Sequence, residues 1–162
     1  MANTLRHGFT ARHGLMAAVP PNRRDSLMAL SRQVSFPTGT RIFDEGGPAE
    51  QFWIVHTGSV ALEMRLPGRR PLVLERVGIS DLLGWSWLLP PHRWHVGAQA
   101  ETLVRAWEFD AQPVRDLCKR DRELGMAVLT YVAGVTADRL MAARTRLLDA
   151  LGPYGASGRL SA

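Results

Sequence analysis

The sequence is poor in cysteine and in lysine. Cys118 is the only cysteine in 162 residues, so no internal disulfide can form and the chain suits a reducing compartment. It follows Val114 and Leu117 at helical spacing, which predicts a buried thiol and not a reactive one. Lys119 is the only lysine among 20 Lys and Arg residues. The arginines are scattered, with no run of five basic residues, so the net charge of +5 is weak evidence for nucleic-acid binding.

Long apolar runs and the local motifs of common enzymes are also missing. No apolar run approaches the roughly 20 residues of a membrane span, and the N-terminus has no apolar core typical of a secretion signal. We therefore predict a cytoplasmic protein without membrane contact. No Gly-x-Ser-x-Gly elbow, Walker loop or Gly-x-Gly-x-x-Gly turn follows a predicted strand, so we predict no catalytic residues and no enzyme activity.

The histidines do not form a convincing metal site. His92 and His95 have the spacing of a ligand pair, but no cysteine lies near them and Asp81 is only a remote third ligand. We therefore predict no bound metal.

The chain is long enough for one domain, which we place at residues 21–151 between a loosely ordered arm (1–20) and a flexible tail (152–162). A short helix is predicted from Pro21 to Leu30. Short alternating segments separated by Gly and Pro turns then follow up to residue 110. Strands at this spacing indicate a small antiparallel barrel or sandwich. The clearest of them alternates over Val60, Leu62, Met64 and Leu66.

Two helices are predicted after the strands. Asp110 caps a short helix to Lys119, and Asp121 starts a helix of some 30 residues that ends at Gly152-Pro153. The long helix carries two apolar stripes, of which one faces the barrel and the other a second copy of the chain. The stripe for the barrel is Leu124, Val128, Tyr131 and Val135; the stripe for the homodimer is Leu129, Ala133, Thr136, Leu140, Ala143 and Leu147.

One segment, residues 78–99, is unusually aromatic and cationic and is the candidate ligand loop. It holds three of the five tryptophans, Trp85, Trp87 and Trp94, together with Arg93. An indole in such a loop can stack on a base or nicotinamide while an arginine pairs with phosphate. Alternatively, the indoles fill the pocket. Trp85 and Trp87 diverge in either an extended or a helical backbone, so at most one of them is expected to enter it.

The pattern of turns resembles the cyclic-nucleotide-binding domain of catabolite-activator-type (Crp/Fnr) regulators. The resemblance rests on Phe36-x-x-Gly39-x-x-Ile42-x-x-Glu45-Gly46 and on Phe52-x-Ile54-x-x-x-Gly58-x-Val60. Residues 80–84, Ser-Asp-Leu-Leu-Gly, resemble the entrance of that family's phosphate-binding cassette, and the long helix resembles its dimerisation helix. This resemblance implies a double-stranded β-helix (jelly-roll) barrel followed by a short helix and a long dimerisation helix.

The resemblance also implies where a ligand binds. The candidates are Asp81, Leu83, Gly84, Trp85, Ser86, Arg93, Trp94 and His95 of the cassette, with Arg139 and Arg144 of the long helix. Nucleotide-binding members have Glu where this chain has Trp85, and an Arg followed by a small hydroxyl residue where it has Arg93 and Trp94. Their Thr or Ser for the purine corresponds to Ala143 and Arg144. The ligand is therefore left open between a cyclic nucleotide, NAD(P)H and none.

The implied function is that of a stand-alone regulatory domain, because only about ten residues follow Gly152, too few for the family's DNA-reading domain. We expect no sequence-specific DNA binding by the chain itself and action through a protein partner. The alternative is an accessory subunit of a larger oxidoreductase, since small proteins of this type accompany NAD-reducing hydrogenases. A free homodimer and co-purification with oxidoreductase subunits would distinguish the two.

Overall fold

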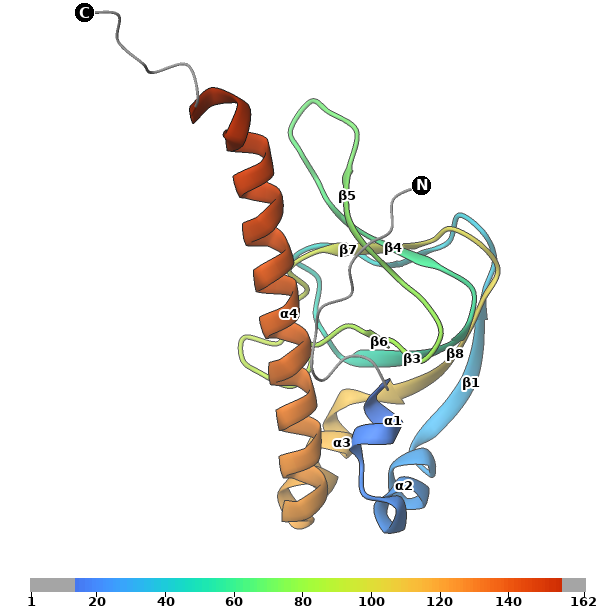
Figure 1. Cartoon of the computed structure of the whole chain (residues 1–162). Helices are drawn as coiled ribbons and strands as arrows, with labels where there is room; N and C mark the ends of the chain where they lie inside the picture. The colour runs from blue at the N-terminus through green and yellow to red at the C-terminus, as the bar shows by residue number, and fades with distance from the viewer. Residues whose placement is uncertain (1–13, 156–162) are drawn as a thin grey trace, which may run out of the picture.

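Eight strands form two four-stranded antiparallel sheets in the computed structural model, which describes residues 14–155 (Figure 1). The sheet orders are β1-β8-β3-β6 and β2-β7-β4-β5, which gives a jelly-roll barrel and confirms the predicted fold. The strands are β1 (Ser31–Phe36), β2 (Arg41–Phe43), β3 (Gln51–Thr57), β4 (Val60–Met64), β5 (Leu72–Val77), β6 (Leu82–Leu83), β7 (Gly97–Ala100) and β8 (Val104–Asp110).

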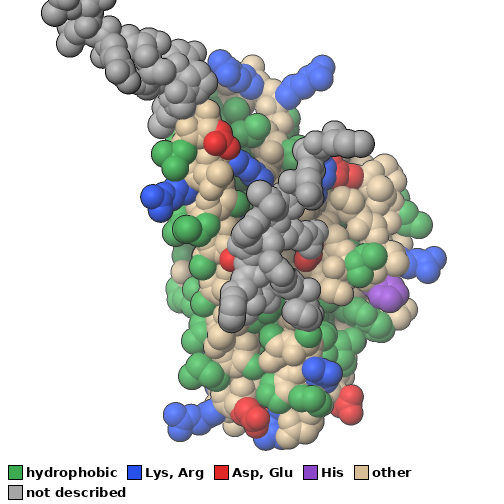
Figure 2. Space-filling view, in the orientation of Figure 1, with side chains coloured by type: hydrophobic (Ala, Val, Ile, Leu, Met, Phe, Trp, Pro, Cys, Tyr) green, Lys and Arg blue, Asp and Glu red, His purple; other side chains and the backbone are tan. Residues whose placement is uncertain are grey.

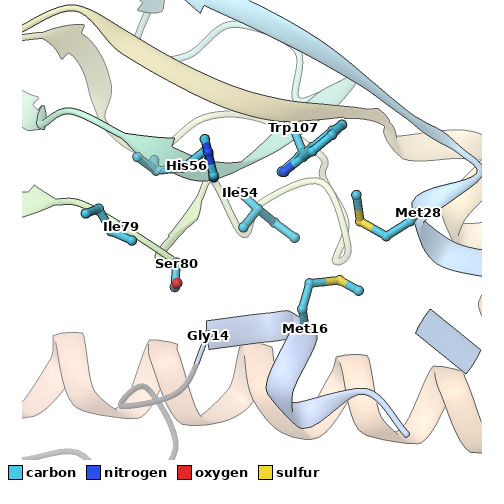
Figure 3. A pocket seen from close by; sticks show the side chains of 9 residues that line it. Gly14, Met16, Met28, Ile54, His56, Ile79, Ser80 and Trp107 are labelled. Atoms are coloured by element: carbon cyan, nitrogen blue, oxygen red, sulfur yellow. The ribbon is translucent and has the colours of Figure 1, made fainter. Parts of the chain in front are cut away.

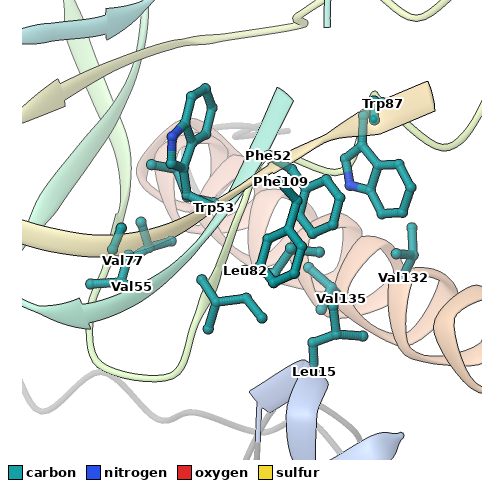
Figure 4. Packing of buried hydrophobic residues seen from close by; sticks show 14 of the residues in the cluster. Leu15, Phe52, Trp53, Val55, Val77, Leu82, Trp87, Phe109, Val132 and Val135 are labelled. Atoms are coloured by element: carbon teal, nitrogen blue, oxygen red, sulfur yellow. The ribbon is translucent and has the colours of Figure 1, made fainter. Parts of the chain in front are cut away.

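Alternation along β3 separates two apolar layers. Phe52 pairs with Phe109 of β8, and the two rings stack with centroids 4.8 Å apart. They lie on the side of the sheet that faces the helices, whereas Trp53 lies on the opposite side, inside the barrel (Figure 4). One layer therefore fills the barrel, and the other joins the barrel to its helices.

Four helices accompany the barrel: α1 (Gly14–Ala18), α2 (Pro21–Met28), α3 (Ala111–Arg120) and α4 (Arg122–Gly155). The predicted cap on α3 is wrong, because the Asp110 side chain makes no capping hydrogen bond there. The long helix α4 begins directly after Asp121, as predicted. The Asp121 carboxylate accepts a hydrogen bond from the Leu124 amide at 3.1 Å, which satisfies one free amide at the start of α4. The helix runs on through the predicted stop at Gly152-Pro153 to Gly155. So close to the helix end, a proline forfeits few intrahelical hydrogen bonds.

The two stripes of α4 differ in exposure as predicted. Leu124, Val128, Tyr131 and Val135 are between 0% and 7% exposed and pack against the barrel. Leu129, Leu140 and Leu147 of the second stripe are 44%, 69% and 60% exposed. Figure 2 shows hydrophobic side chains along the exposed edge of this helix.

Residues 14–20 differ from the predicted loose arm. Gly14–Ala18 forms α1, and Leu15 and Val19 are at most 1% exposed. Gly14 has φ +70°, and a Cβ there would lie 2.5 Å from the Ser80 carbonyl oxygen, so glycine permits the helix to dock closely on the barrel. The contact joins residues far apart in the chain, so the local sequence pattern does not predict it. Residues 1–13 of the predicted arm, and 156–162 of the predicted tail, lie outside the described residues.

Among the described residues, α4 alone has the length and composition of a membrane-crossing helix, over Arg122–Asp149 with a mean hydropathy of 1.2. This is weak evidence, because core helices pass the same test. The first half of α4 supplies the stripe that is buried against the barrel.

Candidate functional site

The cassette begins at a tight turn between β5 and β6. The Asp81 carboxylate accepts a hydrogen bond from the Gly78 amide at 2.8 Å, and the Asp81 carbonyl accepts one from the Val55 amide at 3.1 Å. Leu83 then pairs with Trp53 and is fully buried. Asp81 and Leu83 therefore fix the cassette entrance to β3, and Leu83 offers no surface to a ligand.

Gly84 and Trp94 are in direct contact across the cassette. Gly84 has φ +86°, and a Cβ there would lie 2.6 Å and 2.7 Å from Cζ3 and Cη2 of the Trp94 ring. Only glycine leaves room for this indole, and only glycine adopts this backbone without strain. The ring therefore occupies the space directly beside the cassette glycine.

Trp94 belongs to an aromatic cluster inside the barrel. Its ring stacks on Phe43 with centroids 4.0 Å apart and lies 6.1 Å from the Trp53 ring. The Trp94 carbonyl accepts a hydrogen bond from Gly46 at 2.8 Å, and its amide donates to Gly47 at 2.9 Å. With 5% of its surface exposed, Trp94 is held by both its backbone and its side chain.

The other two cassette tryptophans lie elsewhere. Trp85 is partly buried, and its ring stacks on His95, which is exposed, at 5.3 Å. Trp87 is fully buried in the layer between barrel and helices, where it stacks on Phe52 at 4.0 Å (Figure 4). The sequence analysis considered only Trp85 and Trp87 as fillers of the pocket. Trp94, which is a predicted ligand residue of the cassette, lies inside the barrel, and this inward direction depends on the long-range pairing with Gly46 and Gly47.

The candidate cations lie in separate surroundings. Arg93 is exposed, and its guanidinium donates to the Gly46 carbonyl at 2.9 Å. Arg139 of α4 donates to the Glu75 carboxylate at 2.7 Å. Arg144 is exposed further along α4, and Ser86 is buried in the cassette. Arg93 and Arg139 are thus each engaged by a protein group.

A buried tyrosine joins the cassette entrance to α4. Tyr131 is 1% exposed, and burial, together with the nearby charge of Asp81, raises the pKa of its hydroxyl to about 12. The positive charge of Arg139 opposes this rise. The hydroxyl therefore stays protonated near neutral pH. Tyr131 lies in the predicted buried stripe, but the spacing of apolar residues does not predict that its hydroxyl lies near Asp81 and Arg139.

Phe43 and Trp53 are further site residues that the sequence analysis did not select. Both lie in predicted strand segments, but alternation alone does not reveal which face of a strand turns inward. Across residues 14–155, no group of three His, Cys, Asp or Glu side chains is arranged to hold a metal ion.

The jelly-roll barrel, the cassette between β6 and β7 and the helix that follows define the class of cyclic-nucleotide-binding regulatory domains. The family model described as "Cyclic nucleotide-binding domain" matches residues 33–121, and the chain belongs to this family. The ligand class of the family is a cyclic nucleotide.

Among curated proteins, the chain is similar to a CRP-like cAMP-activated global transcriptional regulator of Mycobacterium tuberculosis. The two are 29% identical over 123 residues, which is 76% of this chain and 55% of the regulator. The chain thus spans about half the length of the curated relatives that it matches.

Solved structures agree on the fold. The N-terminal domain of a transcriptional regulator from Streptomyces coelicolor has 27% identity and a TM-score of 0.65 over 76% of this chain and 89% of that one. The catabolite activator protein of Thermus thermophilus has 23% identity and a TM-score of 0.70, covering 85% and 62% respectively.

Proposed function

We propose that this chain is a regulatory domain of the cyclic-nucleotide-binding type whose nucleotide pocket is closed by its own Trp94. The observation that carries the proposal is the position of the Trp94 ring beside Gly84 and against Phe43, inside the barrel. In this view the domain regulates a protein partner without a bound cyclic nucleotide. Trp85, which stands where the resemblance implies a ribose-binding Glu, supports the same conclusion.

The surface for the partner is α4. Its second stripe leaves Leu129, Leu140 and Leu147 exposed, and large exposed apolar side chains in a row are typical of association surfaces. We assign this stripe to a homodimer, as the heptad spacing predicts. A cytoplasmic location accords with the single free cysteine.

The accessory-subunit alternative and the NAD(P)H ligand have no specific observation in their favour. Arg93, the cation that such a ligand would need in the cassette, is exposed and bonded to the Gly46 carbonyl. Co-purification of the tagged chain with oxidoreductase subunits would support the accessory-subunit alternative.

The test compares the unmodified chain with the Trp94→Ala variant in thermal-shift and calorimetric titrations. We expect cyclic AMP, cyclic GMP, NADH and NADPH to leave the melting temperature of the unmodified chain unchanged. We expect free indole to stabilise Trp94→Ala, because an apolar cavity of ring size accepts an aromatic molecule. Trp85→Ala is the matched control, because it removes an indole that is not stacked in the barrel and should gain no response to indole.

A saturable rise in melting temperature of the unmodified chain with cyclic AMP would overturn the closed pocket. Loss of that response in Arg93→Ala would then assign the phosphate to Arg93.

A further inference from the structure

A cavity of about 240 Å³ lies outside the barrel, away from the aromatic cluster around Trp94 (Figure 3). It is bounded by α1, α2, the surface of β3 and β8 that faces the helices, and the turn at Ser80. Its volume is larger than the roughly 150 Å³ that accepts benzene and smaller than the 300–1,000 Å³ typical of drug-sized ligands. The space therefore fits a molecule of one or two rings.

The walls are largely apolar and adaptable. Met16 of α1 and Met28 of α2 approach the space from the helices, and Ile54 of β3 and the Trp107 ring of β8 approach it from the sheet (Figure 3). Methionine side chains are flexible and polarisable and make favourable contacts with aromatic rings. This lining favours a flat aromatic molecule over a charged sugar or peptide.

Three polar groups on the lining are free to meet a ligand. The Trp107 indole N–H, the His56 ring and the Ser80 hydroxyl have no hydrogen bond to any residue within 14–155, and His56 and Ser80 are exposed. The indole N–H can only donate a hydrogen bond, and the His56 imidazole and the Ser80 hydroxyl can each donate one as well. None of the described lining residues is Asp or Glu. The set therefore suits an acceptor group, and a carboxylate is the strongest small acceptor.

The rim is built with unusual backbone geometry. Ser80 has φ +68° although it is not glycine, and Gly14 opposite it has φ +70°. Positive φ at a serine is strained and persists only where the surrounding structure enforces it. The contact between Gly14 and the Ser80 carbonyl brings α1 against the turn and forms one edge of the cavity.

From these features we infer that the cavity is a binding site for a small aromatic carboxylate of one or two rings. The ring lies against Met16, Met28 and Ile54, and the carboxylate accepts hydrogen bonds from Trp107 and His56. This site is independent of the closed pocket, since it shares no side chain with the aromatic cluster around Trp94.

The experiment titrates the complete, ¹⁵N-labelled chain with salicylate and with indole-3-acetate, to millimolar concentrations. The five tryptophans give separate indole N–H resonances, and the Trp107→Phe variant identifies the one from Trp107. We expect a saturable shift of this resonance. We expect His56→Ala to weaken binding by about tenfold or more, since a hydrogen bond to a charged group is lost. His92→Asn is the matched histidine control and should bind as the unmodified chain does.

A filling variant and a neutral probe complete the design. Met28→Trp should abolish binding by occupying the space, and neutral indole should bind at least about tenfold more weakly than indole-3-acetate. Failure of both acids to shift the Trp107 resonance would overturn the proposal. Equal affinity of His56→Ala and the unmodified chain would also overturn it; this variant should fold, because the His56 side chain is exposed. Binding that appears only after removal of residues 1–13 would overturn it as well.

Discussion

Substitution of Gly84 by Ala tests the contact between Gly84 and the Trp94 ring, on which the proposed closure of the pocket rests. At φ +86° an alanine is strained, which costs about 1–2 kcal/mol. Its Cβ would also lie 2.6 Å from the Trp94 ring, and overpacking of this kind costs about 1–3 kcal/mol more. The free energy of unfolding should therefore fall by about 2–5 kcal/mol, which is the sum of these two costs.

The two costs can be separated with matched variants. Gly39 has φ +85° and no atom within 4 Å of an added Cβ, so Gly39→Ala measures the backbone cost alone. Trp94→Phe removes the outer ring atoms Cζ3 and Cη2, which approach Gly84 most closely. In the Trp94→Phe background, Gly84→Ala should then cost no more than Gly39→Ala does.

Urea unfolding followed by circular dichroism measures all four combinations of the two sites. The coupling free energy between Gly84 and Trp94 should be about 1–3 kcal/mol, within the range for residues in contact. A Gly84→Ala cost that is equal to that of Gly39→Ala, or unchanged by Trp94→Phe, would refute the placement of the Trp94 ring beside Gly84.

Three further outcomes are expected. In a titration followed at 295 nm, Tyr131 should ionise near pH 12. Because this folded pKa lies above the ordinary value near 10, the free energy of unfolding should fall by about 2–3 kcal/mol between pH 10 and 12. Tyr131→Phe should lack this decrease. Leu140→Arg should reduce the dimer fraction in sedimentation equilibrium, whereas Thr145→Arg, exposed on another face of α4, should not; equal effects would contradict the assigned stripe. Cys118 is half-buried and not fully buried as its spacing predicts; this partial burial raises the pKa of its thiol, so iodoacetamide should alkylate it more slowly in the folded chain than in urea at the same pH.

Much of the fold could be predicted from periodicity. The change from a period of two to a helical period near Asp110 marks the real boundary between β8 and α3, and the two stripes of α4 separate buried from exposed positions. The structure differs from the prediction where a contact between distant residues determines the local conformation. Residues 1–20 are predicted to form a loosely ordered arm, yet Gly14 docks on Ser80, 66 positions further along the chain, a contact that no local pattern encodes.

The site was less predictable than the fold. The cassette could be located from its glycines, but the direction of each tryptophan depends on loop pairing. Trp94 turns inward because its backbone is bonded to Gly46 and Gly47 in the turn after β2. Spacing of side chains along the cassette carries no information on that pairing, so it cannot distinguish the inward Trp94 from Trp85 and Trp87.

The two buried cassette tryptophans fix the loop on both sides of the barrel wall. Trp94 is stacked inside the barrel, and Trp87 is stacked on Phe52 outside it, where its carbonyl also accepts a hydrogen bond from Arg115 of α3 at 2.6 Å. Displacing the Trp94 ring costs up to the roughly 3–5 kcal/mol associated with loss of a buried tryptophan. A nucleotide that must first displace it loses affinity by a factor of up to about 10² to a few times 10³. If Trp94 closes the pocket as proposed, a ligand with intrinsic micromolar affinity would need concentrations of about 0.1–1 mM to bind, which is far above its intrinsic dissociation constant.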